Sequence, residues 1–212
     1  MLELHNLSSD NERDIDRLIG FLAEYDDPGV RMRPRDAVDA ALETGLALAL
    51  IRDGKILGCS LVYDFFENVD GPVFSEIGTM RVTLNGQGLQ NLLSYFHLVQ
   101  ISLEDDFSPD HNVFAVVQPN TASEHNLKTK VGMKPWQPPE VLQRLRRSAG
   151  VPFAAEKYCL VAPPNCRKAA FKNLRDLLIG DRLFKTPKGE GRLLIKTGWF
   201  SNDLLDIDFD DD

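Results

Sequence analysis

The feature that most constrains this chain is a pair of apolar runs joined by an Asp-Gly turn. The runs LALALI and ILGCSLVYDF, at 46–51 and 56–65, flank Arg52-Asp53-Gly54-Lys55. An Asp-Gly pair readily adopts the left-handed backbone of a tight hairpin turn, and apolar runs on both sides of it are typical of strands. The sequence therefore predicts two antiparallel strands joined at Asp53 and Gly54.

The composition is that of a globular protein. Of 212 residues, 43% are hydrophobic and 26% are charged, which excludes a chain that is disordered throughout. No uncharged apolar window approaches the roughly 18 residues of a membrane span, and the acidic start MLELHNLSSDNERD lacks the positive charge of a secretory leader. We therefore expect a cytoplasmic protein without a membrane partner.

Neither cysteine nor histidine spacing indicates a metal or disulfide site. Cys59, Cys159 and Cys166 form no Cys-x-x-Cys pair, so we expect three free thiols. No His or Asn motif accompanies Cys59, and a nucleophilic role is not expected. The histidines show no metal-ligand spacing, and His97, inside an apolar helical stretch, is expected to be half-buried and hydrogen-bonded. The sequence predicts no metal.

The net charge of −8 conceals a strong asymmetry along the chain. Residues 1–140 carry 11 Lys/Arg against 22 Asp/Glu, residues 141–200 carry 13 against 4, and residues 201–212 carry none against 6, for net charges of −11, +9 and −6. The basic segment could bind an anionic partner, or it could dock on the acidic first part of the same chain. Docking within the chain is favoured, because an acidic protein repels polyanions at long range.

Helical spacing and turn residues predict the elements around the hairpin. Ser9 and Glu12 form a capping box for a helix over 10–25, and Pro34 and Gly45 bound a helix over 34–44. This beginning, followed by strands and a βαβ unit, indicates an α/β chain. The later elements expected are a strand at 73–83, a glycine loop at 84–90, a helix at 89–103, a strand at 112–118, a helix at 122–131 ended by Gly132, a helix at 139–148, a strand at 157–162, a basic helix at 167–179, a strand at 191–200 and a disordered acidic tail at 206–212.

The glycine loop has a physical interpretation of its own. Gly86 and Gly88 precede a helix, whose first N–H groups and positive dipole end can hold a pyrophosphate; a simple tight turn is the alternative. A dinucleotide-binding fingerprint would need a third glycine near Asn91, and a Walker A loop would need Gly-Lys-Ser/Thr, which this segment lacks. Coenzyme A, held through its pyrophosphate, is compatible with the loop.

Two segments resemble the GNAT N-acetyltransferase superfamily. The run FSEIGTMRVTLNGQGLQNLLSYF is similar to its acyl-CoA-binding segment, in which a strand enters an Arg/Gln-x-x-Gly-x-Gly/Ala loop and then a helix; Thr83 stands where Arg or Gln is usual. The run QPNTASEHNLKTKVGMKPW resembles the second signature, an Asn after a strand and then a helix ending in Gly-Phe or Gly-Met. One residue more than usual separates Asn120 from Gly132. With the upstream hairpin, the likeness covers residues 1–162.

The resemblance implies an α/β (α+β) fold: a GNAT-like mixed, mostly antiparallel sheet flanked by helices. It implies an acyl-CoA-binding domain at 1–165. Residues 166–212, which the resemblance does not cover, are expected to form a basic helical C-terminal extension that ends in the acidic tail. The implied activity is acyl-CoA-dependent N-acyl transfer, from acetyl-CoA or another acyl-CoA, to a primary amine of a small molecule or protein by direct attack in a ternary complex. The residues assigned to coenzyme A are Met80, Arg81, Val82, Asn85, Gly86, Gln87, Gly88, Leu89 and Asn120.

Acyl transfer to an amine needs a base, donors for the oxyanion and a proton for the thiolate. The resemblance places the base at Glu76, where burial between apolar neighbours would make a carboxylate hold a proton more tightly; strand alternation could instead turn it to solvent. Relatives carry a tyrosine in the helix after Asn120, and this helix has none, so Ser123 is assigned its place, with His125 or a water as alternatives. Helix capping is the commoner role of Asn and Ser there.

The end of the hairpin is the expected acceptor site. By resemblance, Tyr63 and Phe65 would lie near the acceptor, although aromatic residues in a strand are also typical of the core. Glu67, with Asp64 and Asp70 beside it, would make the pocket acidic and favour a cationic amine.

Two other classes of function remain open, as does a homodimer. A GNAT-shaped protein without catalysis could be a regulatory or interaction module, which Thr83 and the missing tyrosine favour. Nucleic-acid binding through 141–196 is not expected, because aromatic residues do not alternate with the basic ones. A solvated face is the simplest role for the basic residues of this segment: Arg144, Arg146, Arg147, Arg167, Lys168, Lys172 and Arg175.

Overall fold

Several strands of the protein follow the apolar runs of its sequence. The structure, a computed structural model, describes residues 2–24, 33–68, 71–83, 88–104, 110–177, 183–186 and 189–196. The strands among them are β1 (Leu2–Leu7), β2 (Ala47–Arg52), β3 (Lys55–Phe65), β4 (Phe74–Val82), β5 (Asn112–Val117), β6 (Lys134–Trp136), β7 (Tyr158–Ala162), β8 (Leu183–Thr186) and β9 (Gly189–Lys196).

These strands form one mixed sheet in the order β6-β7-β5-β4-β3-β2-β1-β9-β8. Neighbours run antiparallel except for two parallel pairs, β1 with β9 and β4 with β5. The mostly antiparallel sheet expected from the sequence is confirmed.

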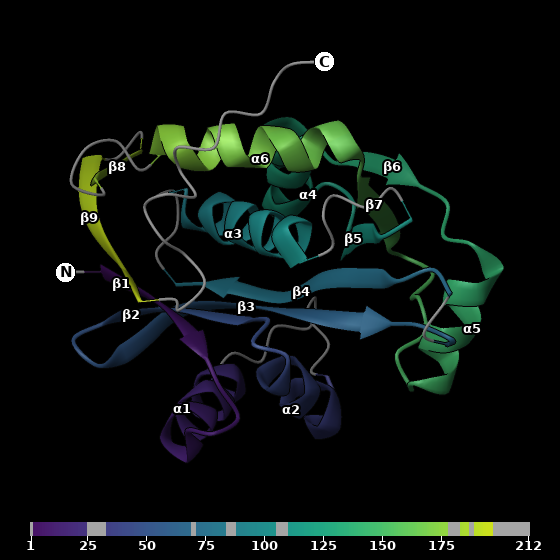
Figure 1. Ribbon diagram of the computed structural model, residues 1–212, viewed down its shortest axis with the longest axis horizontal. Helices are drawn as coiled ribbons and strands as arrows, with labels where there is room; N and C mark the ends of the chain where they lie inside the picture. The colour runs from purple at the N-terminus through teal and green to yellow at the C-terminus, as the bar shows by residue number, and fades with distance from the viewer. Residues whose placement is uncertain are drawn as a thin grey trace.

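The helices cover both faces of the sheet. Figure 1 shows α3, α4 and α6 on one face, α1 and α2 on the opposite face, and α5 near one end. Their bounds are α1 (Glu12–Ala23), α2 (Arg35–Glu43), α3 (Leu89–Glu104), α4 (Ala122–Asn126), α5 (Glu140–Ser148) and α6 (Pro164–Leu177); a π-helical turn, η1 (Leu127–Val131), continues α4.

The Asp-Gly hairpin forms as predicted. β2 pairs antiparallel with β3, and the turn residues Asp53 and Gly54 have left-handed φ angles of 51° and 77°. On its other side β2 pairs with β1, and every residue from Ala47 to Ile51 is buried. A strand with neighbours on both sides and helices above and below needs a continuous apolar run, which is what ALALI supplies.

The start of α1 differs from the prediction. The capping box of Ser9 and Glu12 is wrong: Asn11 is the N-cap residue, and Glu12 is the first residue of the helix. A turn precedes the helix, in which the Asn11 N–H donates to the Ser8 carbonyl at 3.2 Å. Asp10 and Asn11, which the capping box would have placed inside the helix, belong to this turn and to the N-cap.

Three short or unpatterned strands were not predicted. β6 and β8 span 3 and 4 residues, too few for a recognisable alternation. β1 carries His5 and Asn6 in its middle, and its place depends on pairing with β2 and, in parallel, with β9. Partners this distant in the sequence leave no local signal.

The helix after β5 has a wider turn at its end. Ala122–Asn126 is α-helical, Leu127–Val131 is π-helical, and Gly132 ends the element with a left-handed φ of 88°. A π turn holds one residue more than an α turn, and so accommodates the extra residue between Asn120 and Gly132.

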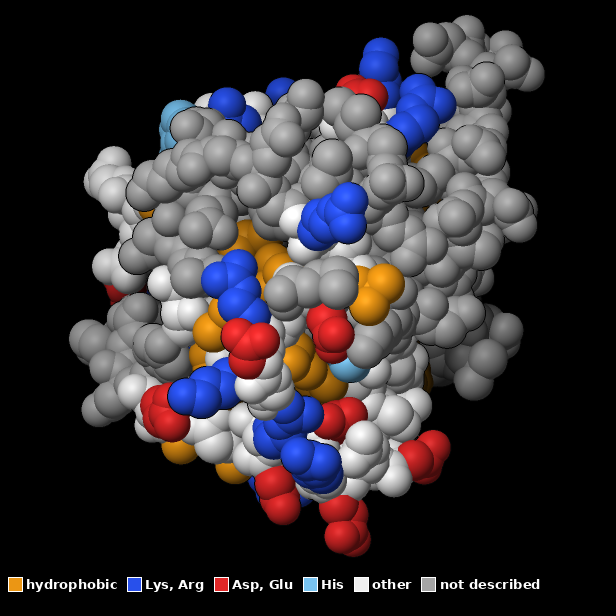
Figure 2. Space-filling view, turned by 90° about the vertical axis from the view of Figure 1, so that its left-hand side faces the viewer, with side chains coloured by type: hydrophobic (Ala, Val, Ile, Leu, Met, Phe, Trp, Pro, Cys, Tyr) orange, Lys and Arg blue, Asp and Glu red, His pale blue; other side chains and the backbone are white. Residues whose placement is uncertain are grey.

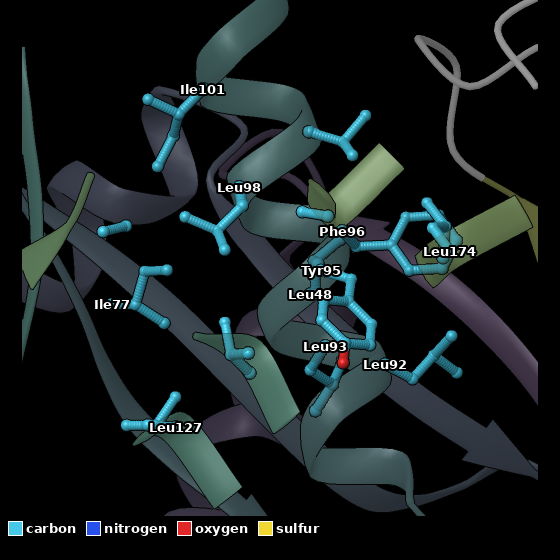
Figure 3. Packing of buried hydrophobic residues seen from close by; sticks show 14 of the residues in the cluster. Leu48, Ile77, Leu92, Leu93, Tyr95, Phe96, Leu98, Ile101, Leu127 and Leu174 are labelled. Carbon is cyan, nitrogen blue, oxygen red and sulfur yellow. The ribbon is translucent and has the colours of Figure 1, made fainter. Parts of the chain in front are cut away.

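The core is divided by the sheet into two layers. In the layer that holds α3, side chains of that helix point toward Leu48 and Ile77 of the sheet and toward Leu174 of α6 (Figure 3). Helical spacing predicts one buried face for this helix, formed by Leu89, Leu92, Leu93, Phe96 and Val99. Tyr95, Leu98 and Ile101, outside that face, are buried as well. The reason is α6, which packs against α3 and covers the side that an amphipathic helix would leave in solvent.

Residues beyond 165 contribute to both the core and the sheet. Cys166, Ala170 and Phe171 of α6 are buried in the α3 layer, and Leu193 of β9 is buried beside β1. The division at 165 stays a prediction. The acidic tail at 206–212 lies outside the described residues.

We expect Phe96→Ala to lower the free energy of unfolding by about 3–5 kcal/mol, because it removes a ring that is 0% exposed. Urea denaturation measures the loss. The control is Phe66→Ala, a ring that is 58% exposed, for which we expect a change within about 0.5 kcal/mol. Equal losses in the two variants would contradict the packing described for α3.

His97 of α3 is fully buried, and the half-buried position expected from the sequence is wrong. Desolvation lowers its pKa from 6.5 to about 4, against a smaller opposing effect of the Ser60 backbone. The ring is therefore neutral in the folded protein at pH 7.

The lowered pKa of His97 predicts that the fold loses stability in acid. Between pH 6.5 and 4 the unfolded chain binds a proton at His97 and the folded chain does not, so the free energy of unfolding falls as the pH falls. We expect His97→Gln to lose about 2 kcal/mol less stability than the wild type between pH 7 and pH 4.5, measured in urea. Equal losses of stability in the variant and the wild type would mean that His97 has the same pKa in the folded and the unfolded chain.

Candidate functional site

β4 and β5 are paired at their beginnings and then separate. Parallel pairing joins Phe74 to Asn112 and continues to the pair Glu76 and Phe114; no pairing joins the later residues of these two fully described strands. β4 stays in the sheet through β3, and β5 through β7. Gly78–Met80 is only half-buried, although β4 is an interior strand. The sheet is therefore open between the carboxyl ends of β4 and β5.

A bulge in β4 lies along this opening. The register with β3 slips between Cys59 and Leu61, so that Thr79 and Met80 together face Ser60. Thr79 has a left-handed φ of 44°, which is uncommon for a β-branched residue. A bulge turns backbone groups out of the regular ladder. The N–H groups around Met80, which the sequence assigned to coenzyme A, therefore lie at an irregular part of the strand.

The start of α3 offers backbone N–H groups to a ligand. Gly88 has a left-handed φ of 69°, and its carbonyl accepts the Leu92 N–H at 3.1 Å, which begins the helix. The N–H groups of residues 89–91, which come before this first bond, have no acceptor within the helix and can bind an anion. Leu89 is buried and fixes this helix end in the core. Three predicted coenzyme A residues, Asn85, Gly86 and Gln87, lie outside the described residues.

Thr83, which stands where relatives have Arg or Gln, is tied to β3. Its N–H and its hydroxyl donate to the Leu57 carbonyl at 2.8 and 2.9 Å. Thr83 thus extends the pairing of β4 with β3 by one residue.

Gln90 joins the two segments that resemble the GNAT signatures. Its Nε2 donates to Ser123 Oγ at 2.8 Å, and its Oε1 accepts from Asn126 Nδ2 at 3.3 Å. The first turn of α3 therefore lies against α4. Ser123 accepts the bond from Gln90 and keeps its own proton for another acceptor.

Thr121 caps α4, so the capping roles suggested for Asn120 and Ser123 are wrong. The Thr121 hydroxyl accepts the Glu124 N–H at 3.2 Å, while the Glu124 carboxylate accepts the Asn120 N–H at 2.6 Å. Asn120 has a left-handed φ of 61°, a conformation that Asn tolerates. Glu124 also accepts a hydrogen bond from the Tyr158 hydroxyl. Together these bonds fix the start of α4 near the end of β5.

Glu76 is buried, with 3% of its surface exposed, and the solvent-facing alternative is wrong. Both of its oxygens are in ion pairs: Oε1 with Arg33, just before α2, and Oε2 with Arg146 of α5. Burial lowers the pKa of Arg146, and the Glu76 carboxylate opposes that shift. The three side chains form a charged cluster inside the layer that holds α1 and α2, which we call the Arg33–Glu76–Arg146 cluster.

Aromatic rings surround this cluster. Tyr63 and Phe65, the two aromatic residues predicted near an acceptor, are both buried. The Arg33 guanidinium lies 5.0 Å from the Tyr63 ring centre, and the Arg146 guanidinium lies 5.3 Å from that of Phe65, 5.9 Å from that of Phe114 and 4.3 Å from that of Phe153. The predicted residues Tyr63, Phe65 and Glu76 are thus brought together.

The acidic residues of the expected acceptor pocket have partners. Glu67 pairs with Arg144 at 2.5 Å, and both side chains are about half exposed, at 51% and 54%. Asp64 accepts the Ser75 hydroxyl, and Ser75 also bonds to His111 Nε2 at 2.6 Å. Asp70 lies outside the described residues.

The basic segment docks in part on the acidic first part of the chain. Arg144 and Arg146 of α5 pair with Glu67 and Glu76, as the favoured interpretation of the charge asymmetry expects. Figure 2 shows the opposite end of the molecule, away from α5, where Lys and Arg side chains lie beside Asp and Glu side chains in the lower half of the view.

The three cysteines are free and buried thiols. Burial raises the pKa of Cys59 to about 12, which leaves it protonated and unreactive at neutral pH. Within the described ranges, no group of three or more His, Cys, Asp or Glu side chains could hold a metal ion. None of the helices in those ranges has the length and apolar character to cross a membrane.

Comparison with known proteins identifies the fold. No family model and no curated protein sequence matches the chain. Solved structures do match over 76% of its length. They include the NatC complex bound to Gag peptide and CoA (TM-score 0.53, 13% identity, 98% of that chain) and Arabidopsis thaliana Naa50 in complex with the bisubstrate analogue CoA-Ac-MVNAL (0.52, 15%, 95% of that chain).

A third match is N-acetylglutamate synthase from Neisseria gonorrhoeae complexed with coenzyme A and N-acetyl-glutamate, with a TM-score of 0.52 and 17% identity. The chain spans 34% of that synthase. All three are N-acetyltransferases of one architecture. This chain has the GNAT fold. The strand before the glycine loop, the helix after it and the helix after Asn120 lie where the sequence predicted them, as β4, α3 and α4 with η1. Residues 84–87 of the loop lie outside the described residues.

Within the GNAT fold, the sequence predicted some residues of the site and missed others. Glu76 and Ser123 were predicted from their place in the signatures, and Tyr63 and Phe65 from their place at the end of the hairpin. Arg33 and Arg146 were missed, because they lie outside both signatures and 43 and 70 residues from Glu76. The solvated face expected for the basic residues is wrong for Arg146 and Arg167, which are 3% and 1% exposed. The charge asymmetry indicated only the region in which Arg146 lies.

Proposed function

We propose that this protein is an acyl-CoA-dependent N-acyltransferase, with acetyl-CoA as the first candidate donor. The observation that carries the proposal is the opening between β4 and β5 beside the bulge at Thr79 and Met80. Beyond Glu76 and Phe114, the backbone N–H and C=O groups on the facing edges of β4 and β5 do not bond to each other. Backbone groups of this kind need another hydrogen-bond partner. The amide-bearing pantetheine arm of coenzyme A supplies one.

The rest of the cofactor would extend along the two signatures. We infer that the pyrophosphate binds the N–H groups after Gly88 and that the arm runs past Met80, Arg81 and Val82 toward Glu76. The Gln90–Ser123 hydrogen bond holds α3 and α4 together beside this path. Asn85, Gly86, Gln87, Leu89 and Asn120 complete the proposed coenzyme A site.

The chemistry proposed is direct attack of the acceptor amine on the thioester carbonyl. A C–N bond forms, the C–S bond breaks, and the amine proton passes to Glu76, directly or through a water. A carboxylate has about four lone-pair sites, so the two arginine contacts leave Glu76 able to accept another hydrogen bond. N–H groups near the bulge bind the oxyanion, and the free proton of Ser123 supplies a hydrogen bond to the departing thiolate.

A primary amine is the proposed acceptor. The matched structures support this: one was solved with a peptide, one with a peptide bisubstrate analogue and one with N-acetyl-glutamate. We propose that Tyr63, Phe65 and Glu67 lie along the acceptor's path, from the side of the sheet that carries α1, α2 and α5.

A regulatory or interaction module that binds acyl-CoA without turnover is the second candidate. One observation favours it: both oxygens of Glu76 are already engaged in ion pairs with two arginines. Binding without thiol release would identify this alternative.

Acetyl-CoA at about 100 times its Kd is expected to raise the free energy of unfolding by about 2.7 kcal/mol, with a visible rise in Tm, because a ligand that binds only the folded state stabilises it. Differential scanning fluorimetry measures the shift. NAD is the matched control: it has a pyrophosphate, but the loop lacks the third glycine of a dinucleotide fingerprint. No shift with acetyl-CoA would remove the proposed function.

Glu76→Gln is expected to lower kcat by about 10²- to 10⁴-fold in a thiol-release assay with an amine panel, because the general base is lost. The acetyl-CoA shift should persist, since Glu76 is not in the proposed coenzyme A site. Glu43→Gln, exposed on α2, is the control and should keep its rate. Turnover by Glu76→Gln within about threefold of the wild type would show that another group is the base.

A further inference from the structure

The Arg33–Glu76–Arg146 cluster contains more positive than negative charge. Two guanidiniums share one carboxylate, and the side chains are 11%, 4% and 4% exposed for Arg33, Glu76 and Arg146. Glu76 is the single acidic side chain that pairs with either arginine among the described residues. The cluster as a whole therefore has one positive charge that is not neutralised there.

An excess charge is costly in these surroundings. The rings of Tyr63, Phe65, Phe114 and Phe153 exclude water from the guanidiniums, and in such a medium a charge without a counterion is strongly destabilising. The same medium makes the attraction for an added anion strong. An anionic ligand is thus the complement that the cluster lacks.

The guanidiniums also have donors to offer. A guanidinium carries five N–H donors, and Arg33 and Arg146 each make one hydrogen bond, to Glu76, within the described residues. Arg146 Nε is buried without a hydrogen-bond partner there. Planar guanidiniums bind carboxylates with two parallel hydrogen bonds, which fits a carboxylate as the ligand.

The position of the cluster connects this ligand to the reaction. Glu76 and Phe114 form the last pair before β4 and β5 separate, so the cluster lies where the opening begins. A molecule that places an anion at the arginines would hold its next few atoms beside Glu76. An amine a few atoms away from the anion of such a ligand would contact the Glu76 carboxylate.

We propose that the acceptor is an amine that bears a carboxylate, an amino-acid type of substrate. Its carboxylate binds Arg33 and Arg146, and its amino group lies at Glu76, which takes the proton that the ammonium form loses before the nitrogen attacks. This inference rests on the proposed acyl transfer and names the class of acceptor. It differs from the cationic amine that Glu67, Asp64 and Asp70 suggested, because Glu67 and Asp64 are already engaged by Arg144 and Ser75.

The test compares each standard amino acid with its own amide, a pair that differs only in the carboxylate. Binding to the CoA-saturated full chain is measured by calorimetry, and turnover by thiol release. We expect at least one amino acid to bind about tenfold or more tightly than its amide, the effect of a charge-assisted hydrogen bond.

Three variants connect that preference to the cluster. Arg33→Met leaves a neutral Glu76–Arg146 pair, and Arg146→Met leaves a neutral Arg33–Glu76 pair, so each variant removes the excess charge and should reduce the preference about tenfold. Arg147→Met is the control, because Arg147 is the exposed neighbour on the same helix and should keep the preference.

The outcomes separate the two proposals. Amides that bind as tightly as their acids, in a protein that acetyl-CoA still stabilises and that releases thiol with simple amines, overturn the amino-acid inference alone. A preference that survives in both cluster variants also overturns it. A chain that acetyl-CoA does not stabilise removes the proposed function and this inference with it.

Discussion

The separation of β4 from β5 is the constraint on which the rest of the site depends. A sheet resists such a break, because each strand then has an edge with unpaired backbone groups. Here the break is possible because β4 stays paired with β3 and β5 with β7, while Phe74–Glu76 still joins the two halves. The bulge at Thr79 and Met80 belongs to the same adjustment, since it bends β4 where pairing ends.

Two groups of side chains meet at this opening from opposite faces of the sheet. On the α3 face, the Gln90–Ser123 bond fixes the helix starts that offer N–H groups. On the α1 and α2 face, the Arg33–Glu76–Arg146 cluster concentrates charge among aromatic rings. In the proposed function, the first face holds the phosphate-bearing cofactor and the second holds the acceptor.

The fold was largely predictable because its signals are local. The Asp53-Gly54 turn, the apolar run of β2 and the glycine at 132 each act over a few residues, and the elements formed where they indicated. β1 was missed because its polar middle gives no alternation and its partners are far away in the chain. The capping box at Ser9 failed for a different reason: a turn competed for the same residues and placed Asn11 at the cap.

By itself, the sequence determined the GNAT fold and the places of Glu76 and Ser123 on its strand and helix, because these follow from short-range patterns that any folded form of the chain must satisfy. Only the tertiary structure decided what surrounds them. Glu76 is buried and doubly paired because Arg33, just before α2, and Arg146 of α5 both contact it on β4. Coulomb interactions act through space, and residues 43 and 70 positions apart gain an interaction only when the sheet brings them together.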